Sequence, residues 1–114
     1  MADFNPHVGD IGVELTVDFK TKDCADAIVA VDLSPAGTVI TICLRTPGGT
    51  VKTFTGVAST CDTFANGTAA YITLSGTDLD VAGVWQISGK AVFLDGRVFR
   101  ASSKNFTVDT PLCP

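Results

Sequence analysis

The feature that most constrains this chain is a pair of alternating runs joined by Asp95-Gly96. In the first run, every second position carries an apolar or small residue: Trp85, Ile87, Gly89, Ala91 and Phe93. Successive side chains of a strand point to opposite faces, so this spacing predicts a strand with one buried face. The alternation resumes at residues 97–100 after the Asp-Gly pair, which adopts the backbone angles of a tight hairpin turn. We therefore expect an antiparallel hairpin, with the only tryptophan as the anchor of the core.

Two segments in the first half of the chain also have the pattern of strands. Residues 11–19 place apolar side chains on one face and polar side chains on the other, which predicts a half-buried strand. Residues 38–45 are rich in β-branched residues and are apolar or Thr on both faces, so we expect a central strand covered on both sides. A short apolar run at residues 28–33 ends in a turn sequence at residues 34–37, and a second turn sequence follows the central strand at residues 46–49. Pro and Gly favour tight turns at both places.

The remaining segments complete an all-β prediction. Further strands are expected at residues 51–57, 69–74 and 105–108, and polar connections at residues 20–27 and 58–68. The chain has one Glu and one Met, so good helix formers are scarce. We predict an antiparallel β-sandwich of about seven to nine strands over residues 11–108. An N-terminal arm (residues 1–10) precedes it, and a C-terminal tail (residues 109–114) follows it.

Charge and hydropathy exclude several classes of partner. The net charge is −4 and the Lys and Arg residues are scattered, so we expect no binding of nucleic acid or of an anionic membrane. No apolar run approaches the roughly 20 residues that span a bilayer. The N-terminus lacks a basic segment followed by an apolar one, so we expect synthesis in the cytoplasm unless a signal was removed.

The residues that could carry chemistry are few. His7 is the only histidine and lies in the predicted arm, where it is not expected to serve a catalytic triad. Asp78 and Asp80 precede a glycine, and although they could bind calcium, a corner in which Asp accepts backbone N–H groups is favoured. With one Glu and no evident acid–base pair, we expect no enzyme activity, no cofactor and no metal.

The cysteines and the glycosylation-type motifs have simpler explanations. None of Cys24, Cys43, Cys61 and Cys113 has zinc-site spacing or a nearby histidine. Cys43 lies in a predicted strand and is expected to be buried, and free thiols are favoured, with a pairing such as Cys24 with Cys61 left open. The Asn66-Gly67-Thr68 motif has the chemistry of a turn, and in Asn105-Phe106-Thr107 the phenylalanine is expected in the core.

The order of motifs in the second half resembles a known family. The matching residues are Asp78, Leu79, Ala82, Gly83, Trp85, Asp95, Gly96, Phe106, Thr107 and Val108. This series is similar to the immunoglobulin-like β-sandwich of tailed-bacteriophage virion proteins, and in particular to the N-terminal domain of phage baseplate upper proteins. The first half fits more loosely, at residues 31–34 and 45–50, where Gly49 replaces the usual acidic residue. Those baseplate proteins continue into a further domain, whereas this sequence stops at Pro114.

The resemblance implies a non-enzymatic structural protein of a virion, in a head-decoration, neck, tail or fibre-adaptor position. It would act as an immunoglobulin-like interaction module, and its arm and tail would contact other virion proteins and copies of itself. The alternative is a carbohydrate-binding or adhesin module for a surface glycan. Because Trp85 and Tyr71 lie in strand patterns that bury one face, such binding would rest on polar loop residues such as Asp62 or Asn66.

Overall fold

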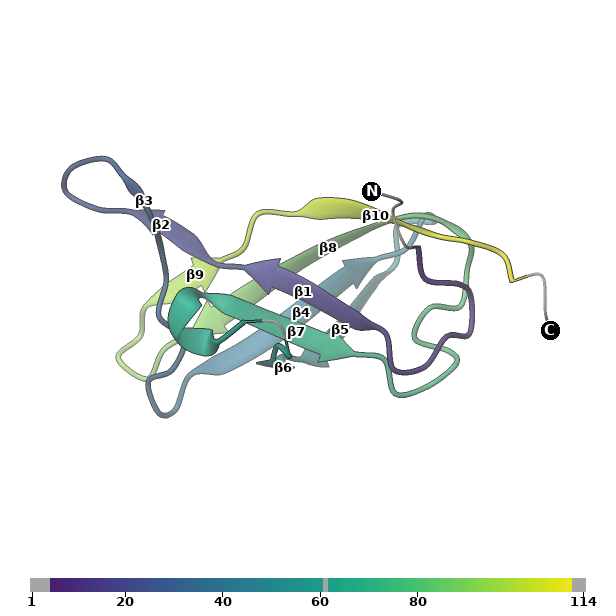
Figure 1. Cartoon of the computed structure of the whole chain (residues 1–114), viewed down its shortest axis with the longest axis horizontal. Coiled ribbons are helices and arrows are strands. Elements are labelled where there is room, and N and C mark those ends of the chain that lie inside the picture. Colours follow the sequence, from purple (N-terminus) through teal and green to yellow (C-terminus); the bar gives the residue numbers. More distant parts are fainter. Residues whose placement is uncertain (1–4, 61, 112–114) are drawn as a thin grey trace.

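The computed structural model describes residues 5–60 and 62–111, which form an antiparallel β-sandwich (Figure 1). In these residues ten strands and one short 3-10 helix, η1 (Phe64–Asn66), are present. The five-stranded sheet contains β4 (Val39–Arg45), β5 (Val51–Thr55), β8 (Gly83–Val92), β9 (Val98–Arg100) and β10 (Lys104–Val108). The three-stranded sheet contains β1 (Glu14–Asp18), β6 (Val57–Ala58) and β7 (Thr68–Ile72). The separate hairpin contains β2 (Lys20–Lys22) and β3 (Ile28–Ala30).

Strand β8 organises the larger sheet. It pairs with β4 along one edge, while β10 and then β9 pair with its other edge. The turn at Asp95-Gly96 closes the predicted hairpin: Gly96 has φ +95°, and the Phe93 N–H donates to the Arg97 carbonyl at 2.8 Å. Residues 101–103 interrupt the edge between β9 and β10.

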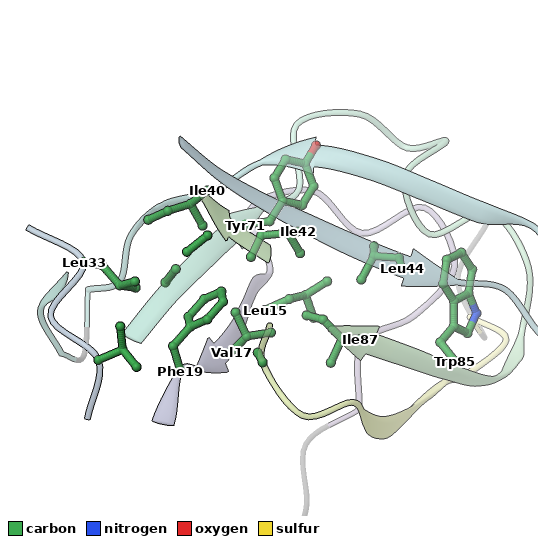
Figure 2. Close-up of a cluster of buried hydrophobic side chains, with 14 of the residues drawn as sticks. Leu15, Val17, Phe19, Leu33, Ile40, Ile42, Leu44, Tyr71, Trp85 and Ile87 are labelled. Atoms are coloured by element: carbon green, nitrogen blue, oxygen red, sulfur yellow. The ribbon is translucent and has the colours of Figure 1, made fainter. Parts of the chain in front are cut away.

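The core lies between the two sheets, and the side chains predicted to face inward along β8 do so (Figure 2). Trp85, Ile87 and Ala91 are buried, as are Ile40, Ile42 and Leu44 of β4 and Leu15 and Val17 of β1. Gly89 has a packing role, because a Cβ added there would lie 2.9 Å from Cζ of Phe19. The glycine therefore lets the aromatic ring of the opposite layer approach the backbone of β8.

Two sequence-based expectations about burial are wrong. Strand β4 is central in its sheet, but its outer face is open: Val39 is 60% exposed and Cys43 is only half-buried. The chain folds into two layers, so nothing in the described residues covers this face. The predicted first strand begins later than expected, at Glu14, and Ile11 is 66% exposed because it precedes the paired segment.

The described part of the predicted arm is paired with the chain itself. The Val8 N–H donates to the Asp109 carbonyl, and the Asp109 N–H donates to the Pro6 carbonyl, both at 2.9 Å. The Gly9 N–H donates to the Leu79 carbonyl at 2.9 Å. Contact of this segment with neighbouring subunits stays a prediction. No helix in the described residues is long and apolar enough to cross a membrane.

Candidate functional site

The Asp78 corner is a buried polar network between β7 and β8. Asp78 is buried, and its Oδ2 accepts a hydrogen bond from the Tyr71 hydroxyl at 2.6 Å. The same oxygen accepts the backbone N–H groups of Leu74 at 2.9 Å and Ser75 at 3.2 Å. These bonds hold the segment between β7 and β8 in its corner, which is the structural role that the sequence favours for Asp78.

Ionisation in this corner is shifted in opposite directions for the two partners. Burial works against the Asp78 carboxylate, but the hydrogen bonds from Tyr71, Leu74 and Ser75 outweigh it, so the pKa of Asp78 is below its ordinary value. Burial, followed by the hydrogen bond to Asp78, raises the pKa of Tyr71 to about 12. At neutral pH the corner therefore holds a charged carboxylate and a neutral phenol.

The shifted phenol gives a direct test of the corner, because Tyr71 is the only tyrosine of the chain. We expect absorbance titration at 295 nm to give a midpoint near 12 in the folded protein. The guanidinium-unfolded chain should titrate near the ordinary value of about 10. Asp78→Asn should lower the folded midpoint, because it removes the charge facing the phenol. Equal midpoints for the folded and unfolded wild-type chain would rule out the buried pair.

Lys52 closes the other side of the corner. Its Nζ donates to the Thr77 carbonyl at 2.8 Å, contacts Asp80 Oδ1 at 3.0 Å and lies 5.4 Å from the centre of the Trp85 ring. Asp80 is therefore an ion-pair partner of a lysine. Within the described ranges, no three His, Cys, Asp or Glu residues form a group that could hold a metal ion.

His7 and the described cysteines are not joined to a catalytic set. The backbone N–H of His7 donates to Asp10 Oδ2 at 2.8 Å, and the ring Nδ1 of His7 lies 3.8 Å from the same oxygen on the surface. Cys24 and Cys43 are free thiols, the first exposed and the second half-buried. Cys61 and Cys113 lie outside the described residues.

The polar residues considered for sugar recognition are hydrogen-bonded to each other, and the aromatic ones are buried. Asn66 ends η1, Gly67 has φ +80° as turn chemistry predicts, and Nδ2 of Asn66 donates to Asp62 Oδ1 at 2.8 Å. The only Trp and the only Tyr are both in the core, so neither ring offers a surface on which a sugar could stack. Asn105 is exposed on β10, and Phe106 packs against the core as expected.

The β2–β3 hairpin is the element that most resembles a contact site. Figure 1 shows it projecting from one end of the sandwich, and all six of its strand residues are exposed. Ile28 is 69% exposed and Val29 is 38% exposed. A two-stranded hairpin is at best marginally stable in water, so apolar side chains on an unsupported hairpin favour a partner surface.

The loop of this hairpin is fixed by its own hydrogen bonds. Oδ1 of Asp23 accepts the N–H groups of Ala25 and Ala27 at 2.9 and 3.0 Å. Asp26 has φ +65°, and its carboxylate lies 3.4 Å from Nζ of Lys22. These bonds fix the loop that precedes Ile28, and a fixed loop would lose less entropy on contact with another surface.

Comparison with family models, curated proteins and solved structures finds no match. The site must therefore be interpreted from its own geometry. Sequence reasoning identified the Asp78 corner but described residues 20–27 only as a polar connection. The missed signal is local: Asp23 with Asp26, between a Lys-Thr-Lys segment and an Ile-Val-Ala segment, is compatible with a hairpin loop.

Proposed function

We propose that this protein is a non-enzymatic structural component of a tailed-phage virion and acts as an immunoglobulin-like interaction module. The observation that carries the interaction role is the projecting β2–β3 hairpin with its exposed Ile28 and Val29. The resemblance of the Asp78–Trp85 corner, the Asp95-Gly96 turn and the final strand to virion domains supports the location in a particle.

The geometry also favours this role over sugar binding. Asp78 and Asp80 are engaged in corner contacts, and Asp62 and Asn66 are bonded to each other. The buried Trp85 and Tyr71 remove the aromatic surfaces on which glycan binding commonly depends. The exposed apolar side chains of the β2–β3 hairpin are suited to contact with another protein.

Quantitative mass spectrometry of gradient-purified particles from the source tests the location. We expect the protein to co-purify at a fixed copy number per particle. A number comparable with the major capsid protein would indicate a shell-decorating module, and a low number would indicate the neck, tail or fibres. Complete absence from the particles would refute the virion proposal, and glycan-array binding at physiological salt would then promote the adhesin alternative.

A further inference from the structure

A hollow of about 250 Å³ lies where β1 and β2 meet the link between β9 and β10. Its polar lining comprises Asp18, Lys20, Arg100, Ser102, Ser103 and Lys104. Three of the chain's eight Lys and Arg residues therefore meet at one place in a protein of net charge −4. The sequence gives no hint of this cluster, because its members come from distant segments.

The three cations of the hollow have no charged partner in the described structure. Across residues 5–60 and 62–111, the ion pairs involve His7, Lys22, Lys52 and Arg97, and none involves Lys20, Arg100 or Lys104. Asp18, the one acidic residue of the lining, has Oδ1 engaged by the hydroxyl of Thr68 at 2.8 Å. The hollow therefore carries an excess of positive charge together with two hydroxyl groups.

Arg100 of the hollow also faces a like charge that lies outside the lining. Arg100 is paired directly across the sheet with Lys90, so two like charges stand on the same face of neighbouring strands. The link that carries Ser102 and Ser103 is fixed to β8, because the Ala101 N–H donates to the Gly89 carbonyl at 2.9 Å and Oγ of Ser88 donates to the Ala101 carbonyl at 2.8 Å. The backbone beside Arg100 and the two serines is therefore held in place, and an anion bound in the hollow would offset the positive charge of Arg100.

We propose that this hollow binds carboxylate side chains of an acidic segment of a partner protein. Arg and Lys with nearby hydroxyls suit carboxylates, and Arg can hold one through two parallel hydrogen bonds. The lining contains no aromatic ring, which favours a protein segment over an acidic sugar. The assignment deepens the proposed function, since it names the chemistry of a partner, but it can be measured on the purified chain alone.

The test is titration of the full-length chain with a hexaglutamate peptide at low salt, followed by amide chemical shifts. We expect saturable binding, with shifts at residues 18–20 and 100–104, that weakens as salt rises. Arg100→Gln and Lys104→Gln should each weaken binding about fivefold to tenfold, because each removes one charge-assisted contact. Lys22→Gln is the matched control: it removes a lysine of β2 outside the lining and should leave affinity unchanged.

A second readout separates a binding role from a structural one. Without peptide, Arg100→Gln should raise the melting temperature at low salt, because it relieves the repulsion from Lys90. The proposal would be overturned if hexaglutamate showed no saturable binding. It would also be overturned if Lys22→Gln weakened the affinity for the peptide as much as Arg100→Gln and Lys104→Gln do. Tighter binding of an oligoglucuronate than of hexaglutamate would overturn the assignment to a protein partner. Because no particle is involved, failure here is distinct from absence of the protein in virions.

Discussion

Replacement of Trp85 by alanine is expected to lower the free energy of unfolding by about 3–5 kcal/mol, the range for removal of a large core aromatic. Trp85 is completely buried, its Nε1 donates to the Val81 carbonyl at 2.8 Å, and its ring centre lies 6.2 Å from that of Phe106. A folded domain typically has only about 5–15 kcal/mol of stability, so this loss is a large part of the total. Urea unfolding followed by far-UV circular dichroism measures the loss without needing tryptophan fluorescence.

The neighbouring residue provides the control for this prediction. Val84 precedes Trp85 in the same strand but points to the open face and is 55% exposed. Val84→Ala should change stability by no more than about 0.5 kcal/mol. If Val84→Ala and Trp85→Ala lowered the free energy of unfolding by the same amount, Trp85 would not be the anchor of the core.

Asp78→Ala should have the second-largest effect, a loss of about 2–4 kcal/mol, because removing an acceptor leaves buried donors unsatisfied. The Tyr71 hydroxyl and the Leu74 and Ser75 N–H groups all lose their shared acceptor. Asp80→Ala removes a more exposed carboxylate from the same corner and should cost less than about 1 kcal/mol. Urea unfolding of both variants checks the prediction, and equal losses would contradict the buried network.

The same network predicts a pH dependence with a definite sign. The pKa of Asp78 is lower in the folded state, so its contribution is present above its unfolded pKa and is lost as pH falls through the folded value. The stability difference between wild type and Asp78→Asn should therefore shrink in acid, below about pH 4. The pKa of Tyr71 is raised to about 12, so the phenol stabilises the fold below its unfolded pKa and loses this effect as pH rises towards 12. If the stability difference between wild type and Asp78→Asn grew as the pH fell, the lowered pKa of Asp78 would be contradicted.

The sequence pattern predicted those elements that are determined by residues close together in the chain. The alternation through Trp85, the Asp95-Gly96 turn and the corner at Asp78 follow from neighbouring residues, and the structure contains all three. The open face of β4 could not be predicted, because β-branched residues suit a central strand whether or not a layer covers it. The exposure of the outer face of β4 depends on which face of its sheet the second sheet covers.

The two proposed interaction elements, the β2–β3 hairpin and the basic hollow, could not be predicted, for two different physical reasons. Strand β2 has the sequence Lys-Thr-Lys and no apolar alternation, and its hairpin depends on side-chain hydrogen bonds from Asp23 that periodicity does not detect. The basic hollow joins Lys20 to Arg100 and Lys104, which only the folded arrangement of β2, β9 and β10 brings together. Contacts between distant segments leave no pattern in a single sequence.

Competitive incorporation tests most directly the proposal that the protein joins a particle through its projecting β2–β3 hairpin. Phage would be grown with equal amounts of wild type and an Ile28→Asp variant, and peptides specific to each would be counted in purified particles. Leu94→Asp is the matched control, since Leu94 is even more exposed, at 84%, but lies in the β8–β9 turn. We expect Ile28→Asp to be depleted about tenfold, because a buried charge at an apolar contact is costly, and Leu94→Asp to be retained. Equal incorporation of Ile28→Asp and wild type would contradict the account.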